Sequence, residues 1–145
     1  MTRILGLDPG TKRIGVAISD PTGAVAQSLN HVKREEGENW IDEIENLVEE
    51  YQVREVVVGF PRNMNGSEGP AAADVRHMVQ ILQSRLKVPI EIWDERLTTV
   101  AAERMFHETG VKQRRAKKHM DGVAATLILQ GYLDYVAQRG GTKRG

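Results

Sequence analysis

Short apolar runs separated by turn residues make up the first part of the chain. They occur at about residues 3–8, 13–19 and 24–32, with Pro9-Gly10 and residues 21–23 between them. Apolar runs of strand length that are joined by Gly- and Pro-containing turns are typical of consecutive antiparallel strands. The pattern therefore predicts a three-stranded antiparallel meander.

After this meander the apolar positions alternate between the helical period and strand-like runs. A strand is predicted over residues 55–59, where the residues after Glu55 form a continuous apolar run, as expected for a strand covered on both faces. A further strand is predicted over residues 90–93. Four helices are predicted where apolar residues recur every three or four positions, at about 39–51, 70–86, 98–109 and 117–137. We expect an α/β fold: a mixed five-stranded sheet flanked by helices, with the first strand central and the two later strands parallel to it.

The composition indicates one domain and excludes several kinds of site. A chain of 145 residues with 40% hydrophobic content can bury a core of its own, so we expect a single domain over residues 1–137. The Gly-rich basic tail, residues 138–145, is expected to be disordered. Without cysteine the chain has no disulfide, thiolate metal site or Cys nucleophile. No secretory signal or transmembrane stretch is visible, which favours a soluble cytoplasmic protein.

Carboxylates stand at the ends of the strands expected to be parallel. Asp8 ends the first strand, and Asp94 and Glu95 end the last one. Because the carboxyl ends of parallel strands meet at one edge of a sheet, these acids should lie close together. Neighbouring residues of a strand point to opposite faces, and the spacing alone does not say whether Asp94 or Glu95 belongs with Asp8. Asp121 heads the apolar stripe of the last helix, which should pack on the sheet.

Such a cluster of acids needs a counter-charge. Burying unpaired carboxylates is costly, and carboxylate oxygens are ligands that Mg²⁺ prefers. Two ions about 4 Å apart would activate a water and stabilise the leaving oxygen of a phosphodiester. Each acid also has an ordinary structural interpretation taken singly, as a turn residue, a helix cap or a partner of the helix dipole. Their convergence at one edge favours a functional site.

Four segments resemble a known family at these same residues. They read "GLDPGTKRIGVAISD", "GFPRNMNGSEG", "DERLTT" with "AE" shortly after, and "DGVAATLILQGYL", and they occur in family order from Ile4 to Leu133. The chain is therefore similar to the YqgF/RuvX family, whose members are described as Holliday junction resolvases and as pre-16S rRNA nucleases.

The resemblance implies an RNase H-like fold, Mg²⁺- or Mn²⁺-dependent nuclease chemistry, and trimming of the 5′ end of the 16S rRNA precursor. It assigns the catalytic, metal-binding acids to Asp8, Glu95 and Asp121, which leaves Asp94 as a cap or outer hydrogen-bond acceptor. Two positions depart from the pattern of related proteins. Asn65 stands where an aspartate is often found, and Ala124 stands where junction resolvases usually place a second aspartate. The second departure favours RNA processing.

Basic residues around these acids are candidates for binding a nucleic-acid backbone. The net charge is zero and the isoelectric point is near 6.9, so binding must rely on a local patch. A run of cations directly precedes Asp121, and contacts of this kind are salt-sensitive. Trp40 and Trp93 are expected in the core, which leaves no stacking platform and favours recognition of duplex shape. The predicted substrate-binding residues are Lys12, Arg13, Arg62, Asn65, Ser67, Arg96, Arg114, Arg115, Lys117 and Lys118.

Several alternatives remain open at this point. The alternative most similar to an RNA nuclease is a nuclease for branched DNA such as a four-way junction. A second alternative is a nucleic-acid-binding module without catalytic activity. An ATPase of the actin and sugar-kinase kind is disfavoured, because such enzymes close two lobes over ATP and need a longer chain. The expected partners are structured RNA such as pre-16S rRNA, or branched DNA, together with ribosomal particles, and no membrane. No heptad seam is visible, so we expect a monomer or weak dimer.

Overall fold

The first three strands form the predicted antiparallel meander. They are β1 (Arg3–Pro9), β2 (Arg13–Ser19) and β3 (Ala26–Lys33). Asp8 pairs with Gly15 across the first hairpin, so β1 continues as a regular strand through its acidic residue. The meander therefore presents Asp8 from a rigid strand and not from a flexible turn.

The remaining elements complete a five-stranded mixed sheet in this computed structural model, which describes residues 3–34, 39–62, 65–95 and 113–140. They are α1 (Asn39–Glu50), β4 (Val53–Phe60), α2 (Pro70–Arg85), β5 (Ile90–Asp94) and α4 (Gln113–Gly140). The strand order is β3-β2-β1-β4-β5, with β4 parallel to both β1 and β5. The central place of the first strand and the parallel pairing are confirmed. The helix predicted over 98–109 lies outside the described residues.

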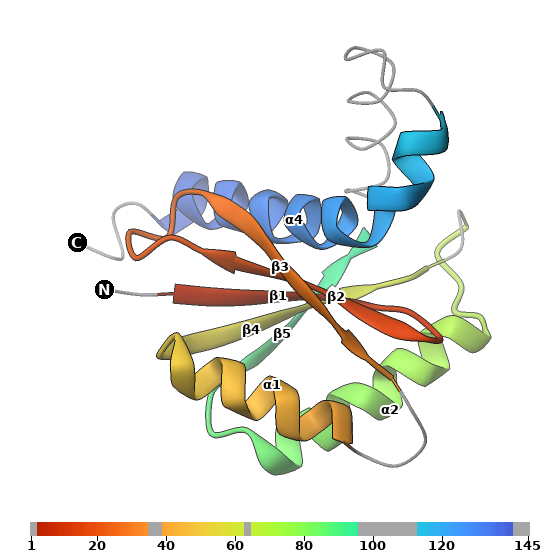
Figure 1. The fold of residues 1–145 in the computed structure, drawn as a ribbon, viewed down its shortest axis with the longest axis horizontal. Helices are drawn as coiled ribbons and strands as arrows, with labels where there is room; N and C mark the ends of the chain where they lie inside the picture. Colours follow the sequence, from red (N-terminus) through yellow and green to blue (C-terminus); the bar gives the residue numbers. More distant parts are fainter. Residues whose placement is uncertain (1–2, 35–38, 63–64, 96–112, 141–145) are drawn as a thin grey trace.

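Helices cover both faces of the sheet (Figure 1): α1 and α2 lie on one face and α4 crosses the other. Each face has its own apolar core. Val56, Val58 and Phe60 of β4 belong to the larger core beneath α1 and α2, while Val57 packs in the core beneath α4. The continuous apolar run of β4 therefore has the predicted cause, because side chains of both faces are buried.

Helix α4 differs from its prediction in extent and in its buried face. It spans residues 113–140, three residues beyond the expected end at 137. Its buried positions are Ala125, Ile128, Leu129 and Leu133, whereas Tyr135, predicted on the inward stripe, is 42% exposed. Near this end of α4, Tyr132 and Tyr135 pack against the half-buried ring of Trp93 in β5. No helix in the described ranges combines the length and apolar character that a membrane span requires.

Candidate active site

Asp8 lies on the face of the sheet that α4 covers. Leu7 belongs to the core beneath α1 and α2, and side chains alternate along a strand. Gly6 faces α4, since a Cβ atom added there would lie 2.8 Å from Cβ of Leu129. Asp8 has the same parity as Gly6 and is half-buried. The carboxylate at the end of β1 is therefore directed to the α4 side.

Glu95 lies on the same face, directly after β5. A Cβ atom added to Gly59 would meet Glu95 Oε1 at 2.8 Å and Glu95 Cγ at 3.2 Å. The same atom would meet Cδ1 of Ile128 in α4 at 2.5 Å, so Gly59 also faces α4. The half-buried Glu95 side chain therefore lies over β4, on the face of the sheet that α4 covers.

Asp94 points the other way. It pairs with Phe60, whose side chain is buried beneath α1 and α2, and it alternates with Trp93, which packs against the core beneath α4. Glu95, and not Asp94, is therefore the acid that shares a face with Asp8. The spacing had left this choice open.

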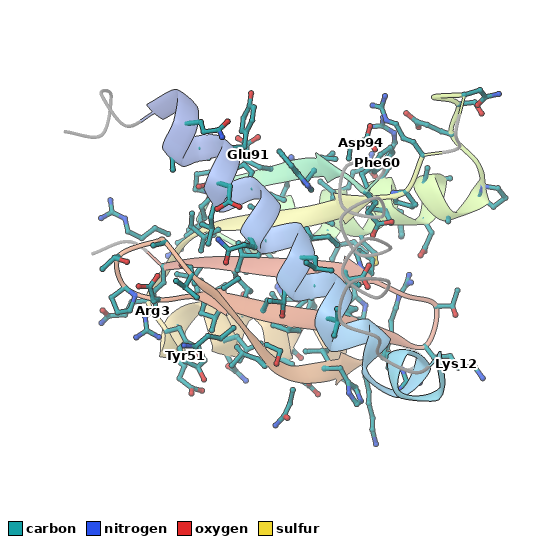
Figure 2. All side chains as sticks on the ribbon, turned by 90° about the horizontal axis from the view of Figure 1, so that it is seen from above. Arg3, Lys12, Tyr51, Phe60, Glu91 and Asp94 are labelled. Atoms are coloured by element: carbon teal, nitrogen blue, oxygen red, sulfur yellow. The ribbon has the colours of Figure 1, made fainter. Side chains whose placement is uncertain are left out.

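The strand register brings the two carboxylates to one level of the sheet. Leu7 pairs with Val58, so Asp8 is level with Gly59, the residue that Glu95 covers. Figure 2 shows this end of the sheet, marked by Lys12, Phe60 and Asp94, while Arg3 and Tyr51 lie at the opposite end. The expected convergence of Asp8 and Glu95 at one edge therefore holds in three dimensions.

The third predicted acid, Asp121, is positioned by the backbone of α4. It lies four residues before Ala125, whose carbonyl oxygen is 3.5 Å from the Cβ position of Gly6 in β1. The side chains of residues 113–121 lie outside the described part of the chain. Among the described side chains, no three His, Asp or Glu residues form a group that could hold a metal ion. Asp8 and Glu95 offer oxygen donors that suit Mg²⁺ or Mn²⁺, and a third ligand from Asp121 stays a prediction.

Three of the basic residues predicted to bind substrate are exposed at this end of the molecule. Lys12 and Arg13 lie on the hairpin after Asp8, and Arg62 follows β4. The Arg62 guanidinium lies 5.5 Å from the centre of the Phe60 ring. The other cations fall outside the described side chains: Arg96, Arg114, Arg115, Lys117 and Lys118.

Asn65 and Ser67 have a local structural role. The Asn65 side-chain oxygen accepts hydrogen bonds from the Ser67 backbone N–H at 3.0 Å and from its hydroxyl at 2.6 Å. This arrangement closes a turn around Gly66, whose φ of 87° suits glycine. Both residues are exposed in the loop after β4. Their predicted contact with substrate is compatible with this turn and stays a prediction.

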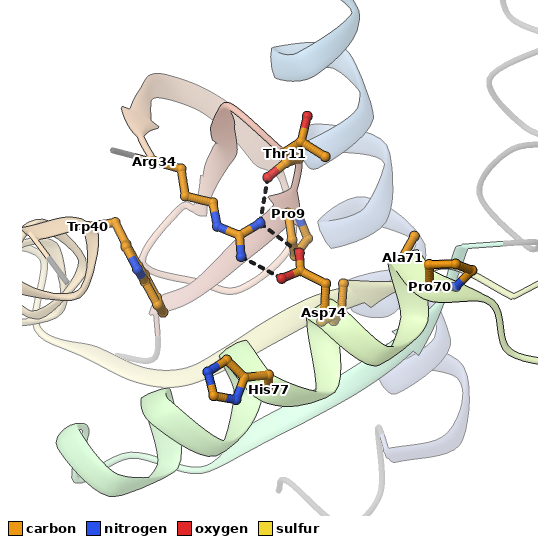
Figure 3. Close-up of a pocket in the computed structure, with 10 residues that line it drawn as sticks. Pro9, Thr11, Arg34, Trp40, Pro70, Ala71, Asp74 and His77 are labelled. Carbon is orange, nitrogen blue, oxygen red and sulfur yellow. Dashed lines mark hydrogen bonds and ion pairs between the residues drawn. The ribbon is translucent and has the colours of Figure 1, made fainter. Parts of the chain in front are cut away.

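A partly buried ion pair behind the first hairpin was not expected from the sequence (Figure 3). Arg34 donates from Nη1 and Nη2 to the two carboxylate oxygens of Asp74 in α2, at 2.7 and 2.6 Å. Its Nη1 also donates to the carbonyl oxygen of Gly10 at 2.9 Å. These groups border an open pocket of about 720 Å³ on the α2 side of the hairpin. Arg34 stands in a charged segment and Asp74 on a helix, so no local signal pairs them.

Replacing Asp74 by asparagine is expected to destabilise the protein by about 1–2 kcal/mol at pH 7, because the Arg34 side chain, which is only 18% exposed, loses its anionic partner. Asp74 itself is 42% exposed, and solvent screening therefore keeps the loss of stability smaller than for a fully buried ion pair. Hydrogen bonds from Arg34 hold the pKa of Asp74 below its ordinary value. A lowered folded-state pKa stabilises the fold above the unfolded pKa of about 3.9, and this contribution is lost as the pH falls through the folded pKa.

Urea unfolding of both proteins between pH 7 and pH 3.5 measures this difference, which should shrink below about pH 4. Glu68→Gln is the matched control. Glu68 pairs with Arg76 in the same bidentate way, but its partner is 49% exposed, and a smaller change is expected. An Asp74→Asn protein as stable as the wild type at pH 7 would show that Arg34 does not depend on this pair.

Solved structures identify the fold. RuvC from Thermus thermophilus superposes with a TM-score of 0.55 at 18% identity, over 97% of this chain and 98% of that one. The fowlpox virus Holliday junction resolvase superposes with a TM-score of 0.53 at 15% identity, over 92% and 99% of the two chains. The fold is thus the RNase H-like fold of the resolvases, as expected.

Sequence relatives identify the family. The RuvX family, described as Holliday junction resolvase, matches residues 2–135, and the chain belongs to it. A protein of Moorella thermoacetica named "Putative pre-16S rRNA nuclease" is 51% identical over 138 residues, which cover 95% of this chain and 99% of the relative. A protein of the same name from Halothermothrix orenii is 47% identical over 92% of this chain and 95% of its own. The family resemblance seen in the four segments is confirmed.

Proposed function

We propose that this protein is a Mg²⁺- or Mn²⁺-dependent nuclease that hydrolyses phosphodiester bonds in the maturation of the 5′ end of pre-16S rRNA. The observation that carries the proposal is the shared position of Asp8 and Glu95. The two half-buried carboxylates, one near the end of β1 and one directly after β5, lie at one edge of the sheet and on one face. The names of the relatives support the RNA substrate, and a cytoplasmic protein with ribosomal particles as partners follows from that role.

In this proposal Asp8 and Glu95 hold the metal together with Asp121. Bound ions would supply the polarisation of a water molecule and the stabilisation of the leaving oxygen. The chain contributes the placement of the ligands. Asp8 is held within a paired strand, and Glu95 directly follows one, so little reorganisation is needed when substrate binds. Their partial burial limits competition from bulk water.

The substrate backbone would cross the exposed cations at this end of the sheet. Lys12 and Arg13 follow Asp8 in the first hairpin. Arg62 comes after β4 and contacts the Phe60 ring, which belongs to the opposite face of the sheet, so it would contact the substrate from the rim. Phosphate contacts from such residues provide affinity without reading the base sequence. The cations before Asp121 would extend this surface, and binding should weaken as salt increases.

A four-way DNA junction is the second candidate substrate. The description of the family and the resolvases that share the fold favour it. Ala124 disfavours strict equivalence of this site to that of the junction resolvases, since a junction resolvase usually carries an aspartate there. A protein that cuts a junction symmetrically must also act as a dimer.

The decisive experiment offers both substrates to the same protein. A pre-16S rRNA fragment containing the 5′ leader and a four-way DNA junction are incubated with Mg²⁺, with Mn²⁺ and with a chelator, and Asp8→Asn serves as the inactive control. We expect metal-dependent cleavage of the RNA alone. Cleavage of the junction alone would make the protein a DNA resolvase. Cleavage of neither, by protein alone or with precursor ribosomal particles, would contradict the proposal and favour a binding module.

A further inference from the structure

We infer that Gly59 is a positioning residue for Glu95: the missing side chain at position 59 leaves the space in which the Glu95 carboxylate folds back across β4 toward Asp8. The inference rests on the proposed function in one respect, namely that Glu95 is a metal ligand. It assigns to β4, which carries none of the three acids, a defined part in building the site.

The geometry of the sheet creates the need for this space. Strand β4 lies between β1 and β5, and neighbouring strands are about 4.8 Å apart, so the backbones that carry Asp8 and Glu95 are separated by about 10 Å. A metal ion joins oxygens that lie within about 2–3 Å of it. The Glu95 side chain must therefore cross the middle strand to share an ion with Asp8.

Contacts at Gly59 show that the side chain takes this path. Glu95 Oε1 and Cγ lie 2.8 and 3.2 Å from the position that a Cβ atom would occupy on Gly59. Gly59 pairs with Trp93 and is level with Asp8, so this point lies in the row of the sheet where the site must form. A methyl group at position 59 would lie too close to the carboxylate, so the Glu95 side chain would have to move away from this point.

A competing explanation is that Gly59 only makes room for α4. Ile128 Cδ1 lies 2.5 Å from the same Cβ position, and Ile128 is 1% exposed, so a methyl group would press on the helix as well. The two explanations can be separated because valine lacks the Cδ1 atom. In an Ile128→Val background, Glu95 is the remaining close neighbour of a residue-59 methyl group.

The test therefore compares variants in the Ile128→Val background. Mn²⁺ affinity is measured by calorimetry on the full chain without substrate, and the melting temperature without metal is measured alongside. We expect Gly59→Ala to weaken Mn²⁺ binding at least tenfold while the melting temperature changes by only a few degrees. Glu95→Gln should weaken binding similarly. Combining both changes should add little, because Gly59 acts through Glu95.

Glu95→Asp provides a second test that leaves Gly59 and the packing of α4 untouched. It keeps the charge but shortens the side chain by one methylene group, so the carboxylate no longer reaches across β4. We expect the same loss of Mn²⁺ affinity as with Glu95→Gln.

The outcomes distinguish the inference from the proposed function. Mn²⁺ affinity that falls with Glu95→Gln but not with Gly59→Ala or Glu95→Asp would overturn the inference and leave Glu95 as a ligand. Loss with Gly59→Ala but not with Glu95→Gln would also overturn it, since Gly59 would then act on something else. No loss with either change would remove Glu95 from the metal site, and both the inference and that part of the proposed function would fall.

Discussion

Replacing Asp8 by asparagine is expected to abolish metal-dependent cleavage, with a fall in kcat/KM of at least about 10³-fold, or about 4 kcal/mol in transition-state stabilisation. The amide has nearly the shape of the carboxylate but lacks the negative charge that holds a divalent cation. Asp8 is half-buried at the end of a paired strand, on the face it shares with Glu95. Removing one of two neighbouring negative charges relieves repulsion, so the melting temperature without metal should stay the same or rise.

Cleavage assays and thermal melts of the metal-free protein measure these two effects. Asp94→Asn is the matched control, because Asp94 also stands at a strand end of the same sheet but on the opposite face from Glu95. Its loss of activity should stay below the roughly 10–100-fold that is typical for an outer partner of a metal ligand, because its side chain lies on the other face of the sheet. A clearly lower melting temperature for Asp8→Asn would instead indicate a structural role for Asp8. Full activity would exclude Asp8 from the chemistry.

Replacing Gly6 by alanine is expected to lower the free energy of unfolding by about 1–3 kcal/mol, the range for an extra methyl group in a packed core. The new Cβ would lie 2.8 Å from Cβ of Leu129 and 3.5 Å from the carbonyl oxygen of Ala125. Both atoms are anchored directly to the helix backbone, so no flexible side chain can yield and α4 must move. Cleavage should fall as well, because the same helix carries Asp121 one turn before Ala125.

Urea unfolding and the cleavage assay test this prediction, with Gly131→Ala as the control. A Cβ on Gly131 would meet the Trp93 ring at 3.5 Å, an ordinary contact distance, and alanine is favoured over glycine inside a helix by about 1 kcal/mol. Gly131→Ala should therefore be neutral or stabilising, although both glycines lie between α4 and the sheet. A Gly6→Ala protein as stable as the wild type would show that β1 and α4 do not need to approach so closely.

Much of the fold could be predicted because local patterns carry it. The strand-length runs and Pro- and Gly-containing turns of the first 33 residues specify the meander, since strand formation and turn formation depend on neighbouring residues. The unbroken Val56–Val58 run predicted a strand covered on both faces, and both faces of β4 are buried. The acid near the end of β1 and the acids around the end of β5 were recognised because parallel strands must end at one edge. The four motifs identified the family.

The remaining features depend on distances between segments that the sequence does not encode locally. Spacing alone did not separate Glu95 from Asp94: the family resemblance pointed to Glu95, and the pleat and register of β5 against β4 give the physical reason. The close approach of Glu95 and Ile128 to Gly59 likewise depends on how β5 and α4 lie against β4. The same limit explains why Tyr135 was wrongly placed inside: a helical stripe predicts which residues share a face, but not where the covering sheet ends.

The sequence by itself thus determined the elements, their order, the family and the set of acids, because periodicity, turns and motifs are properties of short segments. The tertiary structure alone decided that Glu95 lies over Gly59 of β4, and that Arg34 joins Asp74 and the first hairpin. Each of these depends on contacts between residues from 24 to 40 positions apart in the chain. Such contacts arise only when strand register and helix packing fix the elements relative to one another.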